Sequence, residues 1–385
     1  MTNAMYLTEE HHLIRKTVRD FAEREIRPLA HELDESGEFS IELTKKMGDI
    51  GLFGLRTPAK YGGNALDTLS YVIVVEELAR IDSSQAATIA AHISLGIGPI
   101  LNYGTEEQKE KYIPMLSTGE ATWAFGLTEP DAGSDSRNTK SSARLEDGYW
   151  IINGSKIFIT NGASSINKGA TVQVVTGQKD GEKEFSTILV DADTPGFKRV
   201  PMHGKMMWRA SDTAELFFDD CKVPFSNVLG QRGEGSRIML NTLDSGRLAI
   251  AAMGLGLAQG AFELALKYAK ERKQFGRPIA QFQINAFKLA DMATKIELAR
   301  NLLYKGAWLK STDQPFAKEA AMAKLYCSEI AKEVADEALQ LHGGYGLMKD
   351  YDIERFYRDQ RILQIGEGTS EIQRLVISRY IGCYE

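Results

Sequence analysis

The sequence has few of the features that mark disulfide-rich, nucleic-acid-binding, membrane or metal proteins. Its three cysteines, Cys221, Cys327 and Cys383, are odd in number and far apart, which predicts free thiols in a reducing compartment. The net charge is −6 and no dense block of Lys and Arg occurs, so nucleic acid is not expected as the main partner. No uninterrupted run of about 18 apolar residues exists, which argues against a membrane span. The histidines never approach ligand spacing, so no metal site is expected.

Several catalytic motifs are also missing, namely a P-loop, a GxSxG elbow and an HExxH pair. Residues 254–260, GLGLAQG, resemble a dinucleotide fingerprint, but the third glycine is one position late and no strand precedes it. We interpret these glycines as small residues for close helix packing. The N-terminus has neither an apolar signal core nor the character of a transit peptide, which predicts a cytoplasmic, bacterial protein.

What the sequence does contain is three segments of different texture. Residues 1–120 are helical in pattern, residues 121–228 hold short β-prone runs between turns such as Asn153-Gly154, and residues 229–385 are helical again. We predict an α+β multidomain fold with these boundaries. It would have an N-terminal helical domain, a middle antiparallel β-barrel-like domain and a C-terminal four-helix bundle.

Local signals predict where individual helices begin and end. Pro28 is expected to interrupt or end the first helix. Residues 83–101 are Ala-rich and nearly all apolar, which predicts a buried helix. Thr105 with Gln108, and Ser370 with Gln373, have the spacing of a capping box, so each pair should open a helix.

Three segments hold more chemical groups than packing requires. Residues 125–135, FGLTEPDAGSD, bring hydroxyl and carboxylate groups to a glycine turn where backbone amides can approach a ligand. Residues 271–278, ERKQFGRP, set cations around an aromatic, which suits a phosphate beside a flat ring. Residues 340–346, QLHGGYG, hold glycines that can admit a cofactor. Each also has a purely structural explanation, respectively an ordinary turn, cations complementing a helix dipole, and a helix C-cap.

A fourth segment, residues 362–375, places the single carboxylate of Glu367 between two glycines and just before a helix. One explanation is a solvated loop charge. The other is a base held over a substrate, because flanking glycines give a loop the freedom to place one side chain.

Taken together, these blocks resemble the signature blocks of the acyl-CoA dehydrogenase family, in the right order and over nearly the whole chain. They are FGLTEPDAGSD, INGSKIFITNG, WRASDTAELFFDD, RKQFGRPI, QLHGGYG and GEGTSEIQRL. The resemblance, closest to the short-chain and branched-chain group, implies FAD and α,β-dehydrogenation of an acyl-CoA thioester. It also implies electron-transfer flavoprotein as the acceptor and a homotetramer built as a dimer of dimers.

The resemblance implies roles for individual residues. The flavin ring would lie against Phe125, Leu127, Thr128, Gly133, Ser134, Phe158, Ile159 and Thr160, and FAD also against Thr369 and Glu371. A second FAD-binding set, partly donated across a subunit interface, would be Arg272, Gln274, Phe275, Gln283, Gln340, Leu341, Gly343 and Gly344. The acyl-CoA would contact Ser134, Asp244, Arg247 and Gly368.

Within this resemblance Glu367 becomes the catalytic base, which takes the α-proton while the β-hydride goes to flavin N5. A desolvated glutamate has a raised pKa and therefore a stronger drive to accept that proton. Some members take their base instead from the substrate-side helix, directly before its arginine, but that position is Gly246 here. Many relatives have Tyr where this chain has Gly366, and we hypothesise extra room near Cα for α-branched or cyclic acyl groups.

Other interpretations stay open at this point. An acyl-CoA oxidase or an enoyl-CoA reductase would share the same motifs, as would a dehydrogenase of a cyclic or aromatic-pathway acyl-CoA. A catalytically silent structural member of the family is a remote alternative.

Overall fold

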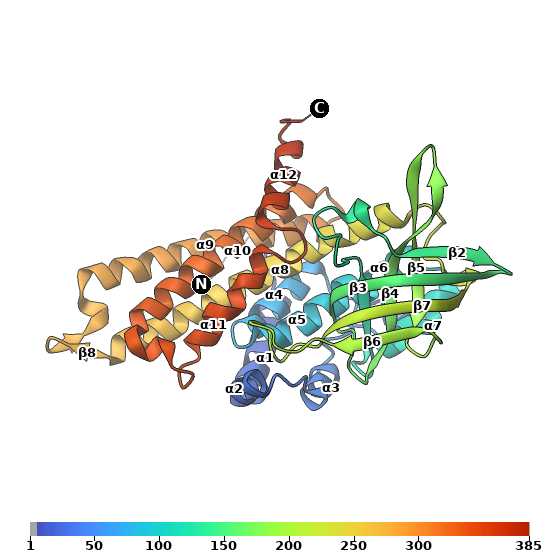
Figure 1. Ribbon diagram of the computed structural model, residues 1–385. Helices are drawn as coiled ribbons and strands as arrows, with labels where there is room; N and C mark the ends of the chain where they lie inside the picture. Colours follow the sequence, from blue (N-terminus) through green and yellow to red (C-terminus); the bar gives the residue numbers. More distant parts are fainter. Residues whose placement is uncertain (1–5, 385) are drawn as a thin grey trace.

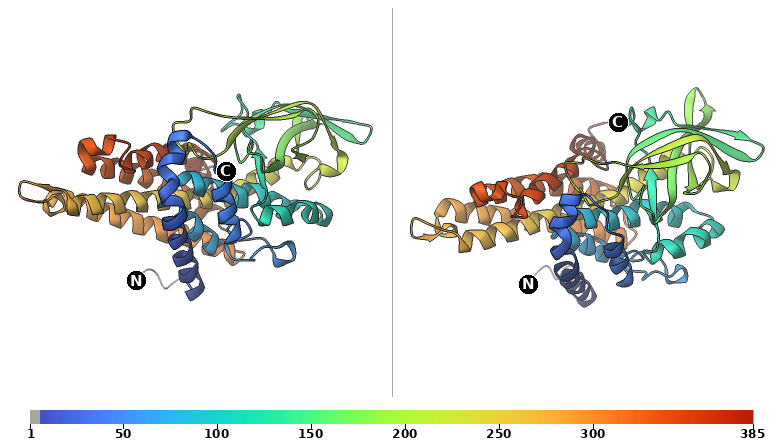
Figure 2. Two further views of the ribbon diagram at one scale, coloured as in Figure 1. Left: turned by 90° about the horizontal axis from the view of Figure 1, so that it is seen from below. Right: turned by 60° about the horizontal axis from the view of Figure 1, so that its bottom comes forward.

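The computed structural model describes residues 6–384 and runs from helices to a curled β-sheet and back to helices (Figure 1). This order confirms the predicted fold class. The sheet lies at one end of the molecule, and the long C-terminal helices extend away from it toward the other end (Figures 1 and 2).

The N-terminal part is a set of seven α-helices with short irregular turns between them. Pro28 lies in the first turn of α2 and follows a π-helical segment, Ala22–Ile26, so it does interrupt the first helix. Residues 83–101 are helical and mostly buried, as predicted, although a π-helical segment, His92–Ile97, divides them. The helices are α1 Glu9–Phe21, α2 Arg27–Ser36, α3 Ile41–Asp49, α4 Thr68–Ala79, α5 Ser83–Ala91, α6 Gly98–Tyr103 and α7 Glu106–Ser117.

The predicted capping box at Thr105 is confirmed at the start of α7. The Thr105 side chain accepts a hydrogen bond from the Gln108 backbone N–H, and the Gln108 side chain accepts one from the Thr105 N–H. Two of the orphan N–H groups at this helix end are thereby satisfied.

The middle part is one seven-stranded sheet with strand order β1-β4-β2-β3-β7-β6, and β5 pairs with β4. Most pairings are antiparallel, but β1 and β2 each pair parallel with β4. Turn signals predict hairpins between neighbouring strands and cannot report a pairing made across a crossover. The strands are β1 Thr122–Gly126, β2 Ser142–Glu146, β3 Tyr149–Thr160, β4 Asn167–Lys179, β5 Glu182–Asp191, β6 Phe197–Pro201 and β7 Thr213–Pro224.

The C-terminal part is built on three long helices that pack side by side, with two shorter ones beyond them (Figure 1). A two-stranded hairpin, β8 Lys273–Gln274 and β9 Arg277–Pro278, joins the first two long helices at the far end of the molecule. Gly343 ends the third long helix with φ of 59°, so residues 340–346 do contain the helix C-cap given above as their structural explanation. The helices are α8 Gly235–Glu271, α9 Gln283–Ser311, α10 Ala317–His342, α11 Ile353–Asp359 and α12 Ser370–Tyr380.

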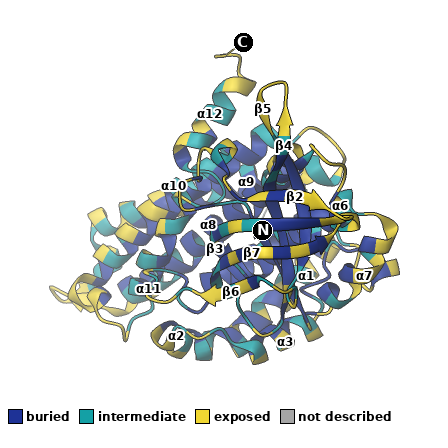
Figure 3. Ribbon diagram, turned by 45° about the vertical axis from the view of Figure 1, so that its right-hand side comes forward, coloured by how far each residue is buried: buried dark blue, intermediate teal, exposed yellow. Residues whose placement is uncertain are grey.

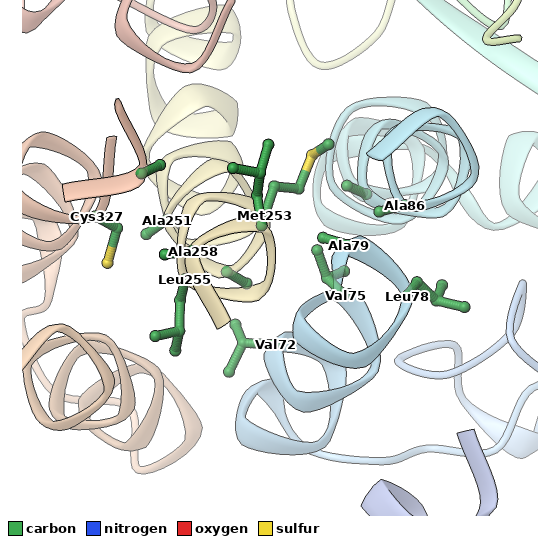
Figure 4. Packing of buried hydrophobic residues seen from close by; sticks show 14 of the residues in the cluster. Val72, Val75, Leu78, Ala79, Ala86, Ala251, Met253, Leu255, Ala258 and Cys327 are labelled. Carbon is green, nitrogen blue, oxygen red and sulfur yellow. The ribbon is translucent and has the colours of Figure 1, made fainter. Parts of the chain in front are cut away.

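Helix α8 is the centre of the core. It is long and apolar enough by composition to cross a membrane, but 78% of its most apolar window is buried inside the protein. Ala251, Leu255 and Ala258 of this helix lie between α4 and Cys327 of α10 (Figure 4). The middle of the molecule is accordingly buried, whereas exposed residues follow the loops and helix ends (Figure 3).

The glycines of α8 allow this close packing, as we interpreted them from the sequence. A Cβ at Gly256 would lie 2.2 Å from the Glu76 carbonyl oxygen of α4, and one at Gly260 would lie 2.2 Å from the Arg80 carbonyl oxygen. A Cβ at Gly254 would lie 2.8 Å from the Cys327 carbonyl oxygen. Because backbone atoms cannot rotate away, any side chain here must push neighbouring segments apart.

We therefore expect Gly256→Ala to destabilise the protein although alanine is the better helix former. Overpacking of this kind costs about 1–3 kcal/mol, more than the gain of about 1 kcal/mol from helix propensity. Thermal unfolding should show a lower midpoint for Gly256→Ala than for the wild type. Lys267→Ala, on the exposed side of the same helix, is the matched control and should unfold near the wild-type temperature. An unchanged or raised midpoint in Gly256→Ala would contradict this packing argument.

Candidate active site

A cavity of about 460 Å³ lies where the sheet meets the helices, and Glu367 is in its wall. It is formed by α5, β1, β3, the first half of α8 and the loop before α12. Twelve residues that the sequence assigns to a site meet here, namely Phe125, Leu127, Thr128, Gly133, Ser134, Phe158, Ile159, Thr160, Arg247, Glu367, Gly368 and Thr369. The first, middle and last thirds of the chain thus contribute to one cavity.

The Glu367 carboxyl group is pressed against α8 at Gly246, a position where that helix has no side chain. A Cβ at Gly246 would lie only 1.7 Å from Glu367 Oε2, so the carboxyl occupies the space that any larger residue would need. This Oε2 atom is buried and makes no hydrogen bond to residues 6–384. Burial raises the pKa of Glu367 to about 7, although the charges of Lys324 and Arg247 oppose that rise.

The loop that carries Glu367 has an unusual backbone. Glu367 has φ of 52° and Gly368 has φ of 91°, so two successive residues are in the left-handed region. A glutamate there is strained, and such strain persists only where the surroundings hold it. The Gln373 side chain, fully buried in α12, donates to the carbonyl oxygens of Glu367 at 3.3 Å and Gly368 at 3.0 Å.

The predicted capping box at Ser370 is wrong. The N-cap of α12 is Thr369, whose hydroxyl accepts a hydrogen bond from the Ile372 N–H. Gln373 cannot complete a box because its amide holds the carbonyls of the Glu367 loop instead. The Ser370 hydroxyl donates to a Glu329 carboxylate oxygen at 2.8 Å.

The β side of the cavity presents an aromatic ring at an irregular point of β3. The β3–β7 register shifts between Lys156 and Ile159, and within this bulge Phe158 has φ of 62°. Bulges re-aim side chains, and here the ring lies at the cavity while 64% of it remains exposed. An exposed ring beside Thr128 and Thr160 is suited to stacking against a flat heteroaromatic ligand.

A buried ion pair that the sequence analysis did not find fixes the adjoining loop. Lys156 Nζ lies 2.7 Å from Glu129 Oε1, and both side chains are almost fully buried. Lys156 also donates to the Leu127 carbonyl at 3.3 Å, and Glu129 accepts from the backbone N–H of Lys140 and of Ser141. No sequence spacing links residues 129 and 156, since the contact depends on how β1 and β3 pack.

The walls that α5 and the segment after it contribute to the cavity are apolar, and the sequence did not indicate these residues as part of a site. Ala87, Ala90 and Ala91 of α5 form one wall, and Leu95 follows them in the π-helical segment. Trp208 enters from the segment before β7 with φ of 45° and donates its backbone N–H to Asp359 Oδ1 at 2.8 Å. Small residues here give room, and the apolar surroundings explain why a carboxyl in this cavity holds its proton to higher pH.

The two charged residues assigned to the substrate side are paired with each other. Arg247 lines the cavity, and its guanidinium donates to the Asp244 carboxylate one turn earlier in α8. Burial raises the pKa of Asp244, although Arg247 and Lys310 oppose the rise. Arg247 Nε is buried without a hydrogen-bond partner among the described residues, so the pair retains one free donor.

The second predicted FAD set does not reach this cavity within one chain. Its members gather around the β8–β9 hairpin, at the opposite end of the helices from the sheet (Figures 1 and 2). The Arg272 Cζ atom lies 5.5 Å from the ring centroid of Tyr345, and Phe275 is 94% exposed. A Cβ at Gly343 or Gly344 would meet nothing within 4 Å, so the backbone is open there. Glu371 is exposed on α12 and does not line the cavity.

The chain matches three family models that together cover most of its length. The N-terminal, middle and C-terminal domains of acyl-CoA dehydrogenase match residues 8–120, 124–221 and 233–382. These matches define an oxidoreductase that acts on acyl-CoA thioesters. The chain belongs to the acyl-CoA dehydrogenase family, whose members are FAD-dependent.

Individual relatives agree with this assignment. The chain is 48% identical to the probable acyl-CoA dehydrogenase YngJ of Bacillus subtilis, over 97% of this chain and 98% of that protein. It is 44% identical to the caffeyl-CoA reductase-Etf complex subunit CarC of Acetobacterium woodii, over 97% and 98% of the two chains. The structure of butyryl-CoA dehydrogenase from Megasphaera elsdenii has a TM-score of 0.95 at 41% identity, covering 98% of this chain and 100% of that chain.

The contact between Gly246 and Glu367 can be tested directly. A Cβ at residue 246 must displace the Glu367 carboxyl, and displacement of a reacting group by about 1 Å can cost on the order of 100-fold in rate. We expect Gly246→Ala to fold normally, since only the far end of a flexible side chain must move, and to lose most of its dehydrogenase turnover. Asn241→Ala, on an exposed position of α8, is the control and should keep its turnover. Full activity in Gly246→Ala would show that Glu367 does not act from this position.

Proposed function

We propose that this protein uses FAD to oxidise a short- or branched-chain acyl-CoA thioester to the 2-enoyl-CoA, with Glu367 as the base. The observation that carries the proposal is the Glu367 carboxyl, which has a buried, unpartnered oxygen in an apolar cavity and a pKa of about 7. A structural carboxylate would be paired, as Glu129 is with Lys156.

The residues around the cavity fit the isoalloxazine part of FAD. The exposed ring of Phe158 provides a stacking surface, and Thr128 and Thr160 add hydroxyl groups beside it. At Gly133 a Cβ would meet nothing within 4 Å, which leaves backbone open for a ligand to approach. When bound, FAD supplies the acceptor for the β-hydride, and the protein contributes orientation and electrostatics.

The proton transfer depends on the environment of Glu367. The α-proton of a thioester is a weak acid, and a carboxylate deprived of water is a stronger base toward it than one in solution. The apolar walls around Ala87, Ala90 and Trp208 keep that environment dry once ligands fill the cavity. Arg247, Asp244, Ser134 and Gly368 are proposed to contact the acyl-CoA beside it.

The β8–β9 hairpin and its neighbours are proposed to bind the remainder of FAD in another copy of the chain. Support comes from the exposure of side chains that are usually buried, since Phe275 is 94%, Ile284 66% and Leu347 71% exposed. A homotetramer and delivery of electrons to electron-transfer flavoprotein complete the proposal, and the relative in an Etf complex favours the latter. A cytoplasmic location stays a prediction.

The central test compares the wild type with Glu367→Gln on a panel of acyl-CoA thioesters and an artificial electron acceptor. Glutamine keeps the shape of the side chain but cannot accept the proton, so turnover should fall by about 10³-fold. FAD should be retained, which the flavin absorbance of the purified variant reports. In the wild type kcat/KM should rise with pH through about 7, because only ionised Glu367 can accept a proton. Turnover near the wild-type rate in Glu367→Gln would remove the base assignment.

The reverse direction is a second candidate, because a relative is named caffeyl-CoA reductase. The same carboxyl, once protonated, can return a proton to Cα, so the site does not select a direction by itself. Anaerobic addition of a saturated acyl-CoA should bleach the flavin of a dehydrogenase. Peroxide formation on admission of air would indicate an oxidase instead.

The glycine at residue 366 makes a separate prediction about the substrate. Gly366 lines the cavity, and a Cβ there would sit 3.6 Å from the Ile362 carbonyl oxygen, an ordinary contact distance. We therefore expect the wild type to accept isobutyryl- and 2-methylbutyryl-CoA at least as well as butyryl-CoA. Gly366→Tyr should fold and shift the preference toward the straight chain by about tenfold, a pocket effect of 1–3 kcal/mol. A clear preference of the wild type for butyryl-CoA would contradict this hypothesis.

A further inference from the structure

Lys324 of α10 is fully buried directly behind the loop that carries Glu367. Its ammonium group donates a hydrogen bond to the Gly368 carbonyl oxygen at 2.8 Å, and the side chain is 0% exposed. The same carbonyl accepts the Gln373 amide at 3.0 Å. Two buried donors from different helices therefore hold one carbonyl, in the residue that follows Glu367.

The charge of Lys324 is not explained by packing. Within residues 6–384 its one hydrogen bond is to a neutral carbonyl, and no carboxylate lies within ion-pair distance. Lys156, the other fully buried lysine, is held by Glu129 at 2.7 Å. A buried charge without a partner costs several kcal/mol, so an apolar residue would stabilise this part of α10 better.

The groups that face Lys324 come from three helices and the loop. Burial lowers the pKa of Lys324 to about 8, Glu367 raises it, Arg247 of α8 lowers it, and Glu329 of α10 and Glu371 of α12 raise it. Glu329 is already engaged, since its oxygens accept from Ser370 and Gln364. Glu371 is exposed and is screened by solvent.

Glu367 in turn is faced by two cations and a phenol. Arg247 and Lys324 both oppose the burial-induced rise in the pKa of Glu367. Burial, and to a smaller extent the charge of Glu367, raise the pKa of the Tyr71 phenol in α4. Tyr71 is neutral at physiological pH and donates its hydroxyl to the Ala90 carbonyl. Arg247 is engaged in its own ion pair with Asp244, whereas Lys324 forms no ion pair within residues 6–384.

We propose that Lys324 is a positioning residue for the reaction, which holds the strained Glu367 loop through Gly368 and keeps the base ionised near neutral pH. This inference rests on the proposed function, because it requires Glu367 to accept a proton. The tether and the charge are separable, since Gln373 provides the same kind of tether without a charge.

The experiment follows proton abstraction without oxidation. Acetyl-CoA has no β-carbon and cannot be dehydrogenated, so exchange of its α-protons with deuterium from D₂O reports the base alone. The exchange rate is measured by mass spectrometry as a function of pH on the purified FAD-containing wild type, Lys324→Met, Gln373→Leu and Glu367→Gln. Thermal unfolding and flavin content are recorded for each variant.

In the wild type the exchange rate should rise with pH through about 7. In Lys324→Met the midpoint should move up by about one pH unit or more, because the carboxylate loses a nearby cation. That shift slows exchange at neutral pH by roughly fivefold, before any loss from misplacement is added. Gln373→Leu should lower the limiting rate but leave the midpoint in place, since it removes a neutral donor.

A midpoint in Lys324→Met equal to that of the wild type would overturn the proposal, even if stability or the limiting rate had fallen. Lys324→Gln replaces Lys324→Met if the latter does not fold, because its amide keeps a donor in the buried site. Failure of both variants to fold would assign Lys324 to the core and would also overturn the proposal. Failure of the proposed function looks different, since Glu367→Gln would then exchange protons as fast as the wild type.

Discussion

The close approach of α8 to its neighbours is the constraint on which the rest of the structure depends. This 37-residue helix can lie against α4 and α10 because Gly254, Gly256 and Gly260 present no Cβ to the carbonyl oxygens opposite them. The same device, used once more at Gly246, makes room for the Glu367 carboxyl. The carboxyl of the candidate base therefore packs against α8, while its loop is held by Lys324 of α10 and Gln373 of α12. This explains why the carboxyl can be dehydrated without a partner of its own.

Charges inside this protein are of two kinds. Most buried ones form direct pairs, such as Lys156 with Glu129 and Arg300 with Glu76, in which the Coulomb attraction offsets the loss of water. Around the cavity the pairing is incomplete, since Glu367 and Lys324 influence each other without an ion-pair contact. A direct pair would lower the basicity of Glu367 and block its approach to a substrate. An uncompensated carboxylate would hold its proton too tightly to act near neutral pH. Lys324 contacts the loop through the Gly368 carbonyl and makes no direct pair with Glu367. Its effect on the pKa of Glu367 is therefore intermediate between these two cases.

The sequence predicted those features that depend on local spacing or on long motifs. The fold class, the capping box at Thr105 and the packing role of the glycines in α8 follow from patterns of a few residues, and the structure confirms them. The N-cap of α12 was assigned one residue too late because Gln373 makes tertiary bonds that its spacing from Ser370 does not reveal. The parallel pairing of β1 with β4, the left-handed Phe158 and the Glu129–Lys156 pair arise only when distant segments meet. In the sequence Lys324 is indistinguishable from an ordinary helix lysine, and only the structure shows that it contacts the loop that carries Glu367.

The separation of the two predicted FAD sets has a consequence for assembly. Arg247 at the cavity and Arg272 at the hairpin are 25 positions apart, of which all but the last lie in α8, so about 38 Å of helix axis separates them. That length exceeds the reach of one extended dinucleotide whose ring end lies at Phe158. If both sets hold FAD, the hairpin must hold a cofactor whose ring lies in another copy of the chain. The exposed Phe275 would then be buried by the partner, and neither copy would have a complete site alone. Association would be a requirement of cofactor binding itself, which makes loss of FAD and dissociation coupled events.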